Sequence, residues 1–154
     1  MPAAALLDLP DEDSTRRLGR RLAALARPGD VIALGGTLGA GKTTLARAFV
    51  QALLGEDEEV PSPTFTLVQT YDSEAGTIWH FDLYRLDRAE DVFELGIEEA
   101  LADGICLIEW PDRLGHLLPR RRLDLDLSAG AGATARRATL TSHAQWDDRI
   151  GDIA

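Results

Sequence analysis

The sequence has almost no lysine, a single cysteine and no long apolar run, and it is strongly acidic. Of its 16 Lys and Arg residues, only Lys42 is a lysine. The net charge of −10 argues against autonomous binding to a nucleic-acid backbone, which needs clustered cations. No stretch approaches the roughly 20 apolar residues of a membrane span. We therefore expect a protein without a membrane segment that does not bind a nucleic-acid backbone on its own, which leaves work on RNA through a partner open.

The cysteine content and the first residues point to a cytoplasmic protein. Cys106 lies in the apolar segment 105–108, which indicates a buried free thiol, not a disulfide partner or a nucleophile. The first eight residues have no basic region and meet an acid early, so no signal peptide is expected. A length of 154 residues predicts one domain, spanning 1–154.

The single lysine stands in a phosphate-binding pattern. Residues 36–43 read GTLGAGKT and fit the P-loop motif G-x-x-x-x-G-K-[ST]. Residues 30–35 have the composition of a short buried strand, and residues 43–54 carry apolar side chains at helical spacing. Strand, glycine-rich loop and helix are the context that the motif needs. Lysine is a compact point charge, whereas arginine is a broad planar fork, so a loop around phosphates has room for lysine.

Each part of this loop predicts a contact with a nucleotide. The glycines let backbone N–H groups turn toward phosphate oxygens, and the following helix adds the positive end of its dipole. Lys42 is expected to reach the β- and γ-phosphates and the Thr43 hydroxyl to ligate Mg²⁺. The loop alone does not identify the base. The nucleotide-binding residues predicted here are Gly36, Gly39, Ala40, Gly41, Lys42, Thr43 and Thr44.

The remaining segments alternate between strand and helix patterns, which predicts an α/β fold. We expect a P-loop NTPase-like three-layer fold with a central mixed β-sheet flanked by helices. Strands are expected at 3–8, 64–71, 77–84, 105–109, 122–127 and 137–141; helices are expected at 11–26, 88–93, 97–101 and 143–150. The turn at 72–76 predicts a hairpin, and a Gly/Ala-rich turn at 129–135 pairs the last two strands.

Two acids and a threonine are candidates to complete the site. A P-loop needs a carboxylate for its Mg²⁺, and the carboxyl ends of parallel strands lie beside the loop. Glu109 ends the apolar strand 105–109, and Asp82 ends a strand of mixed polarity; either acid could instead be a solvated strand end. Thr64 follows a proline-stiffened loop, where a sensor of the γ-phosphate would stand, or it simply opens a strand.

Three further features have two interpretations each. The arginine clusters Arg120–Arg122 and Arg136–Arg137 are either a solvated rim or a contact for nucleotide or partner. Trp110 follows Glu109 and precedes Pro111, so it is either an interface anchor for partner or nucleotide or a side chain packed under the loop.

Five segments together resemble the TsaE (YjeE) family, the bacterial ATPases of tRNA threonylcarbamoyladenosine synthesis. They occur in the family's order and spacing over nearly the whole chain: GAGKTT at 39–44, SPTFTLV at 62–68, HFDLYRL at 80–86, ELG at 94–96 and ICLIEWP at 105–111. The P-loop occurs in many families, whereas HFDLYRL and IEWP together are specific. One departure is Thr37, where the family pattern leads us to expect an acid.

The resemblance implies a P-loop ATPase that uses ATP and Mg²⁺ and acts with the TsaB–TsaD heterodimer. TsaD carries out the transfer to adenosine beside the anticodon, and the ATPase is thought to reset that assembly, so tRNA is met only through the complex. By the match, Lys42 and Thr43 bind phosphate and metal, and Thr64 is switch-like. Asp82, Glu109 and Trp110 are then functional, with Lys42, Asp82 and Glu109 the catalytic candidates.

The sequence also bears on three alternative functions: a GTPase, a small-molecule kinase and a nucleotide sensor. A GTPase would carry N-K-x-D for guanine, which cannot exist in a chain whose one lysine is Lys42. A P-loop small-molecule kinase would need an arginine-rich lid, for which only Arg120–Arg122 is available, and a strand pattern follows it. A non-catalytic ATP/ADP sensor would share every binding residue, so it stays open. Our expected division of labour is that Thr43 and Glu109 hold Mg²⁺ while Asp82 orients the attacking water.

Overall fold

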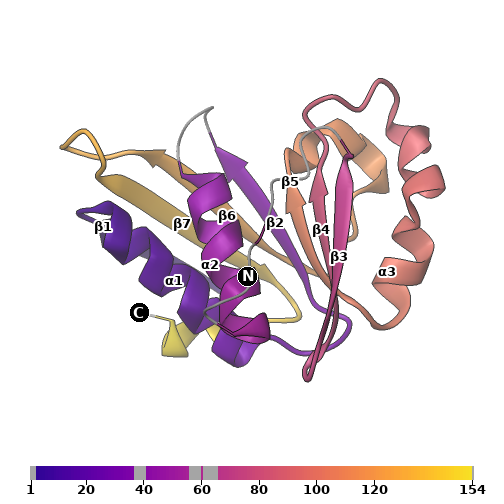
Figure 1. Cartoon of the computed structure of the whole chain (residues 1–154). Coiled ribbons are helices and arrows are strands. Elements are labelled where there is room, and N and C mark those ends of the chain that lie inside the picture. Colours follow the sequence, from indigo (N-terminus) through magenta and orange to yellow (C-terminus); the bar gives the residue numbers. More distant parts are fainter. Residues whose placement is uncertain (1–2, 37–40, 56–59, 61–65, 154) are drawn as a thin grey trace.

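Seven strands form one mixed sheet with helices on both of its faces (Figure 1). The computed structural model describes residues 3–36, 41–55, 60 and 66–153. The strands are β1 (Ala4–Leu9), β2 (Val31–Gly36), β3 (Val68–Ser73), β4 (Gly76–Asp82), β5 (Ile105–Glu109), β6 (Arg122–Ala129) and β7 (Arg136–His143). The α-helices are α1 (Glu12–Leu25), α2 (Lys42–Leu54) and α3 (Ile97–Asp103), and 3₁₀ helices occupy η1 (Ala89–Leu95), η2 (Pro111–Leu117) and η3 (Ile150–Asp152).

The strand order is β1-β7-β6-β2-β5-β4-β3, and the four strands at its centre run parallel. β2 pairs in parallel with both β5 and β6, and β4 pairs in parallel with β5. The β3–β4, β6–β7 and β1–β7 pairs are antiparallel, which makes the sheet mixed, as predicted. Because β2, β5 and β4 are parallel, their carboxyl ends meet at one edge, and α2 begins at that edge.

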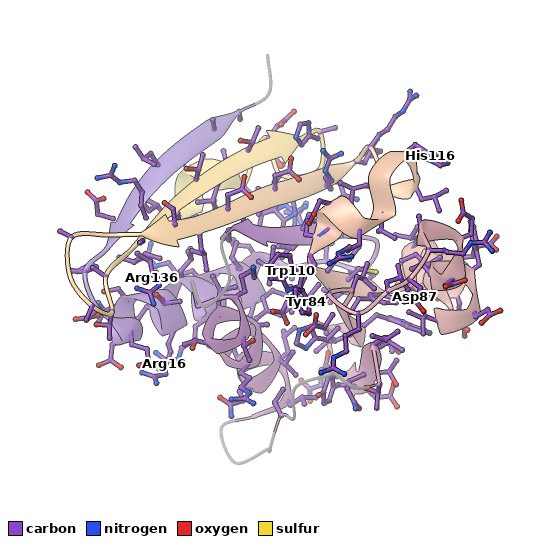
Figure 2. All side chains as sticks on the ribbon, turned by 90° about the horizontal axis from the view of Figure 1, so that it is seen from above. Arg16, Tyr84, Asp87, Trp110, His116 and Arg136 are labelled. Carbon is purple, nitrogen blue, oxygen red and sulfur yellow. The ribbon has the colours of Figure 1, made fainter. Side chains whose placement is uncertain are left out.

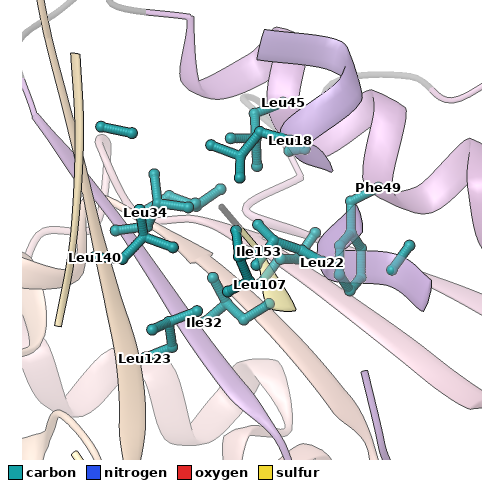
Figure 3. Close-up of a cluster of buried hydrophobic side chains, with 14 of the residues drawn as sticks. Leu18, Leu22, Ile32, Leu34, Leu45, Phe49, Leu107, Leu123, Leu140 and Ile153 are labelled. Atoms are coloured by element: carbon teal, nitrogen blue, oxygen red, sulfur yellow. The ribbon is translucent and has the colours of Figure 1, made fainter. Parts of the chain in front are cut away.

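Alternation along the strands divides the core into two clusters. Ile32 and Leu34 of β2 face α1 and α2, where they meet Leu22 and Phe49 in the cluster shown in Figure 3. Val31 belongs to the opposite cluster, with residues of β5, α3, η1 and η2. A strand buried on both faces has to be apolar on both, which explains the continuous apolar run of β2. The structure therefore confirms the three layers and the α/β fold class.

Helix α1 follows the boundaries that its sequence indicates. Asp11 caps it, because its carboxylate accepts from the Ser14 backbone N–H at 2.8 Å. Gly19 lies where α1 meets α2, and a Cβ there would come 2.6 Å from the Leu45 carbonyl oxygen. The absence of a side chain lets the two helices approach closely, which fixes α2 over the sheet.

Two segments differ in type from the sequence expectations, and residues 66 and 67 of the strand expected at 64–71 precede β3. Residues 111–117 form η2, for which no helix was expected, and the expected helix at 143–150 is replaced by turns that lead into η3. In the second case Arg149 is buried and donates to both carboxylate oxygens of Asp30 at 2.8 and 2.9 Å, and Trp146 is fully buried. These long-range contacts hold the segment together with short-range backbone hydrogen bonds, in which the N–H groups of Arg149 and Ile150 donate to the Trp146 carbonyl. Across the described residues, no helix is both long and apolar enough to cross a membrane.

Candidate functional site

The candidate site lies where β2, β5 and β4 end and α2 begins. The sheet register places Glu109 beside Leu34 on one side and beside Asp82 on the other. The Trp110 backbone N–H donates to the Leu34 carbonyl at 3.3 Å, which joins the end of β5 to the end of β2. Lys42 opens α2 at the same edge. Residues far apart in the sequence are thus brought together by the parallel pairing.

Two glycines of the P-loop motif have conformations that a side chain would oppose. Gly36 has φ of 119°, and a Cβ there would overlap the Leu127 carbonyl oxygen. Gly41 has φ of 95° and is the N-cap of α2. Of the predicted nucleotide-binding residues, Gly36, Gly41, Lys42, Thr43 and Thr44 are described, whereas Gly39, Ala40 and Thr64 lie outside the described residues.

The Lys42 ammonium is buried at the start of the helix. Lys42 is only 5% exposed; its Nζ donates to the Gly36 carbonyl at 3.0 Å and lies 3.6 Å from the ring centroid of Trp110. Burial lowers the pKa of Lys42 from its ordinary value, and the nearby carboxylates, led by Glu109, partly offset this effect. A carbonyl oxygen and an aromatic face thus surround a desolvated cation.

Glu109 is at the centre of the polar contacts. It is 2% exposed, and its Oε2 lies 2.7 Å from Nε2 of the fully buried His80. Its Oε1 accepts from the Thr43 hydroxyl at 3.5 Å. Asp82 is also buried, and its Oδ1 accepts from the Tyr84 backbone N–H at 3.2 Å. The two predicted acids therefore lie side by side, with Asp82 one strand farther from β2.

These oxygen groups fit Mg²⁺ better than a metal that prefers nitrogen or sulfur. The Thr43 hydroxyl and the Glu109 carboxylate are hard oxygen donors, and at 3.5 Å they are close enough for one cation to bridge them after a small shift. No group of three or more His, Cys, Asp or Glu residues able to hold a metal occurs in the described part of the chain. Such a sparse donor set suits Mg²⁺, which uses one or two protein groups together with phosphates and water.

Trp110 begins a row of contacting side chains that extends from the site to the surface. Its backbone is left-handed, with φ of 59°, and its ring lies 5.0 Å from the ring of Tyr84 (Figure 2). The guanidinium of Arg113 lies 5.6 Å from the Tyr84 ring, and Tyr84 is 44% exposed. Trp110 is itself half-buried and packs on the second core cluster, as the packed alternative expected, whereas its role as an interface anchor stays a prediction.

A polar cavity lies on the other side of the P-loop motif. It has a volume of about 170 Å³, and its lining residues are Glu12, Thr15, Gly41, Thr44, Thr134 and Arg136. Of the two arginine clusters, one therefore reaches the site through Arg136, labelled in Figure 2. From the other cluster, Arg122 pairs with Asp124 at 2.7 Å instead.

Sequence reasoning assigned no site role to several of these residues, among them His80, Tyr84 and Glu12. His80 had a detectable signal, because strand alternation places it on the same face as Asp82. Tyr84 and Glu12 had none, since their places depend on contacts between separate elements.

A family comparison decides which proteins this arrangement belongs with. Residues 9–138 match the family model described as "Threonylcarbamoyl adenosine biosynthesis protein TsaE". The chain belongs to the TsaE family. The resemblance drawn from the five sequence segments is thereby confirmed.

Relatives and a solved structure agree with the TsaE assignment. The tRNA threonylcarbamoyladenosine biosynthesis protein TsaE of Rickettsia conorii is 40% identical over 135 residues, 88% of this chain and 77% of that protein. The protein of the same name from Bacillus subtilis is 39% identical over 132 residues, 84% and 80% of the two chains. The crystal structure of Bacillus subtilis YdiB superposes with a TM-score of 0.76 at 28% identity and covers 99% of this chain and 94% of that one.

The burial of Lys42 predicts that this side chain costs stability. Because folding lowers its pKa below the ordinary 10.5, the charged form is disfavoured in the fold, and the cost is fully present at neutral pH. Lys42→Met should therefore leave the nucleotide-free melting temperature unchanged or raise it by up to about 4 °C, the effect of roughly 1 kcal/mol in a chain of this size. The difference in melting temperature between Lys42→Met and the unaltered protein should narrow as pH rises toward 10.5.

Lys42→Arg is the matched control, because it keeps the charge and needs more room. Its melting temperature should be lower than that of the unaltered protein. Thermal unfolding between pH 7 and 10 measures both variants. A lower melting temperature for Lys42→Met would contradict the account.

Proposed function

We propose that this chain binds ATP with Mg²⁺ and hydrolyses it as a component of tRNA threonylcarbamoyladenosine biosynthesis. The observation that carries the proposal is the meeting of Lys42, Thr43 and Glu109 where α2 starts beside the ends of β2 and β5. Membership of the TsaE family supports the pathway, because the relatives carry that pathway in their names. We place the activity in the cytoplasm.

The nucleotide is proposed to lie across the edge of the sheet. Its terminal phosphates would meet Lys42 and Thr43, which stand on the Glu109 side of the helix start. The cavity between Thr44 and Arg136 lies on the opposite side of Gly41 and would receive the nucleoside. The Arg136 guanidinium can there interact with the negative charge of an α-phosphate or with the π face of a base.

Phosphate binding has a clear consequence for Lys42 and Trp110. The ammonium now contacts the Gly36 carbonyl and the Trp110 ring, and the β- and γ-phosphate oxygens would take over these contacts. The bound phosphates would also add negative charge beside a buried cation whose pKa burial lowers despite the nearby carboxylates. The cost of holding Lys42 desolvated would thus be recovered when the nucleotide binds.

The two acids are proposed to have separate roles in hydrolysis. Glu109 and Thr43 would hold Mg²⁺, which when bound neutralises negative charge on the phosphates. Asp82 would orient the attacking water, because it lies at the same edge one strand farther from Lys42 and Thr43. The transferred phosphoryl group requires little covalent chemistry, so positioning and charge account for the catalysis.

We further propose that activity depends on the TsaB–TsaD pair and that tRNA is met only through it. The net charge of −10 disfavours independent binding to tRNA. The row of Trp110, Tyr84 and Arg113 extends from Lys42 to the exposed Tyr84 and Arg113 and could link a bound partner to the phosphates. Aromatic and arginine side chains are the residues that most often anchor protein interfaces.

Nucleotide binding should stabilise the protein, and ATP should do so more than GTP. At a hundred times its dissociation constant, Mg²⁺–ATP adds about 2.7 kcal/mol, a rise in melting temperature of roughly 5–11 °C. GTP should give a smaller rise, because N-K-x-D is absent from the sequence. Thermal-shift titrations with and without Mg²⁺ and the TsaB–TsaD pair measure this. Equal shifts from ATP and GTP would count against the assignment.

Substitution of the two acids should separate binding from hydrolysis. Glu109→Gln should weaken Mg²⁺-dependent ATP affinity by about tenfold or more, because the bound metal loses a charged ligand. Asp82→Asn should leave affinity nearly unchanged and slow single-turnover hydrolysis by about 10²–10⁴-fold.

Hydrolysis should be measured with the TsaB–TsaD pair present, and affinity by calorimetry. If Asp82→Asn loses metal-dependent affinity while Glu109→Gln keeps it, the roles are reversed. If the unaltered protein binds ATP but shows no turnover even with its partners, it is a nucleotide sensor.

A further inference from the structure

His80 is a completely buried imidazole that the proposed chemistry does not yet use. Its Nε2 lies 2.7 Å from Glu109 Oε2, while the other oxygen of the same carboxylate accepts from Thr43 at 3.5 Å. His80 and Asp82 stand two residues apart on β4, so both point to the face that α2 covers. Glu109 is thus held between an imidazole on β4 and a hydroxyl on α2.

We propose that His80 is a positioning residue that fixes the Glu109 carboxylate for Mg²⁺ by donating its Nε2 proton to Oε2. This inference rests on the proposed function of the site. With Oε2 occupied by His80, Oε1 is left facing the Thr43 hydroxyl, the other proposed ligand. A rotation of the carboxylate would break the 2.7 Å hydrogen bond, so one orientation is favoured before any metal arrives.

The other imidazole nitrogen shows that this arrangement is not optimised for stability. Nδ1 of His80 is buried and has no hydrogen-bond partner among the described residues. A buried polar atom without a partner costs free energy, and an apolar side chain of similar size would avoid that cost. Within the described part of the chain, the hydrogen bond to Glu109 is the one interaction of the ring that explains a histidine at this position.

The polarity of the hydrogen bond follows from the acceptor. A carboxylate can only accept, so Nε2 must carry a proton, and in the neutral imidazole Nδ1 then presents a lone pair. Imidazoles that hold metal-binding groups in place by such hydrogen bonds typically change metal affinity 10- to 100-fold when they are removed. The expected effect of His80 lies in this range and appears in the Mg²⁺ dependence of nucleotide binding.

The first test compares substitutions that keep or remove the donor. His80→Gln places an amide N–H near the Nε2 position, whereas His80→Leu has no donor and His80→Asn is too short to reach Glu109. ADP affinity is measured by calorimetry over a series of Mg²⁺ concentrations. His80→Leu and His80→Asn should need at least about tenfold more Mg²⁺ than the unaltered protein for the half-maximal increase in ADP affinity. For His80→Gln this Mg²⁺ concentration should stay within about threefold of that of the unaltered protein.

The chain offers a matched control in a second histidine–carboxylate pair. His143 Nε2 lies 2.8 Å from Asp124 Oδ2, at the end of the sheet opposite the candidate site. His143→Leu removes a hydrogen bond of the same kind and should leave the Mg²⁺ dependence unchanged. If His80→Leu fails to fold, the comparison of His80→Gln with His80→Asn still tests the donor.

The outcomes separate this inference from the proposed function. If the unaltered protein binds ADP without any Mg²⁺ dependence, the proposed function fails. If the unaltered protein depends on Mg²⁺ and His80→Leu or His80→Asn has the same Mg²⁺ dependence, the positioning role is overturned. It is also overturned if His80→Gln is as impaired as His80→Leu. Nitrogen-15 NMR of the metal-free protein gives a second readout: the Nε2–H tautomer of His80 is expected, and the Nδ1–H tautomer would overturn the inference.

Discussion

The parallel pairing of β2 with β5 is the constraint on which the rest of the site depends. It sets Glu109 beside Leu34, the last buried residue of β2 before the P-loop motif. The parallel pairing of β4 with β5 adds Asp82 in register with Glu109. It also brings His80 within hydrogen-bond distance of Glu109. A slip of one residue in β5 would turn Glu109 to the opposite face and replace it with a neighbour of the wrong chemistry.

Helix α2 provides the second half of the site, and close packing fixes its position. Gly19 allows α1 to approach α2, and Leu45 and Phe49 anchor α2 on the sheet through the first core cluster. The helix therefore presents Lys42 and Thr43 at a fixed height above the strand ends. The cost of this precision is the desolvated Lys42 and the Nδ1 of His80, which has no hydrogen-bond partner in the described ranges; stability alone explains neither feature.

Local patterns in the sequence predicted the features that depend on neighbouring residues. The uniformly apolar run of β5 predicted a buried strand ending in Glu109, and Asp11 with the acids after it marked the start of α1. The full order of the strands could not be predicted. β7 lies between β1 and β6, and the residues that β1 pairs with on β7 are more than 100 positions away in the sequence. For the same reason the cavity that joins Glu12 to Arg136, and the contact of His80 with Glu109, appear only in the folded chain.

The central claim is that Thr43 and Glu109 together hold the metal of a bound nucleotide. A crystal structure of the protein with ADP and Mn²⁺ in place of Mg²⁺ tests it most directly, because anomalous scattering locates the manganese ion. The account predicts manganese bound to Thr43 Oγ1 and to one Glu109 carboxylate oxygen at about 2.1 Å, beside the ADP phosphates. Manganese bound to Asp82 and remote from Glu109, or ADP bound away from Lys42, would contradict it.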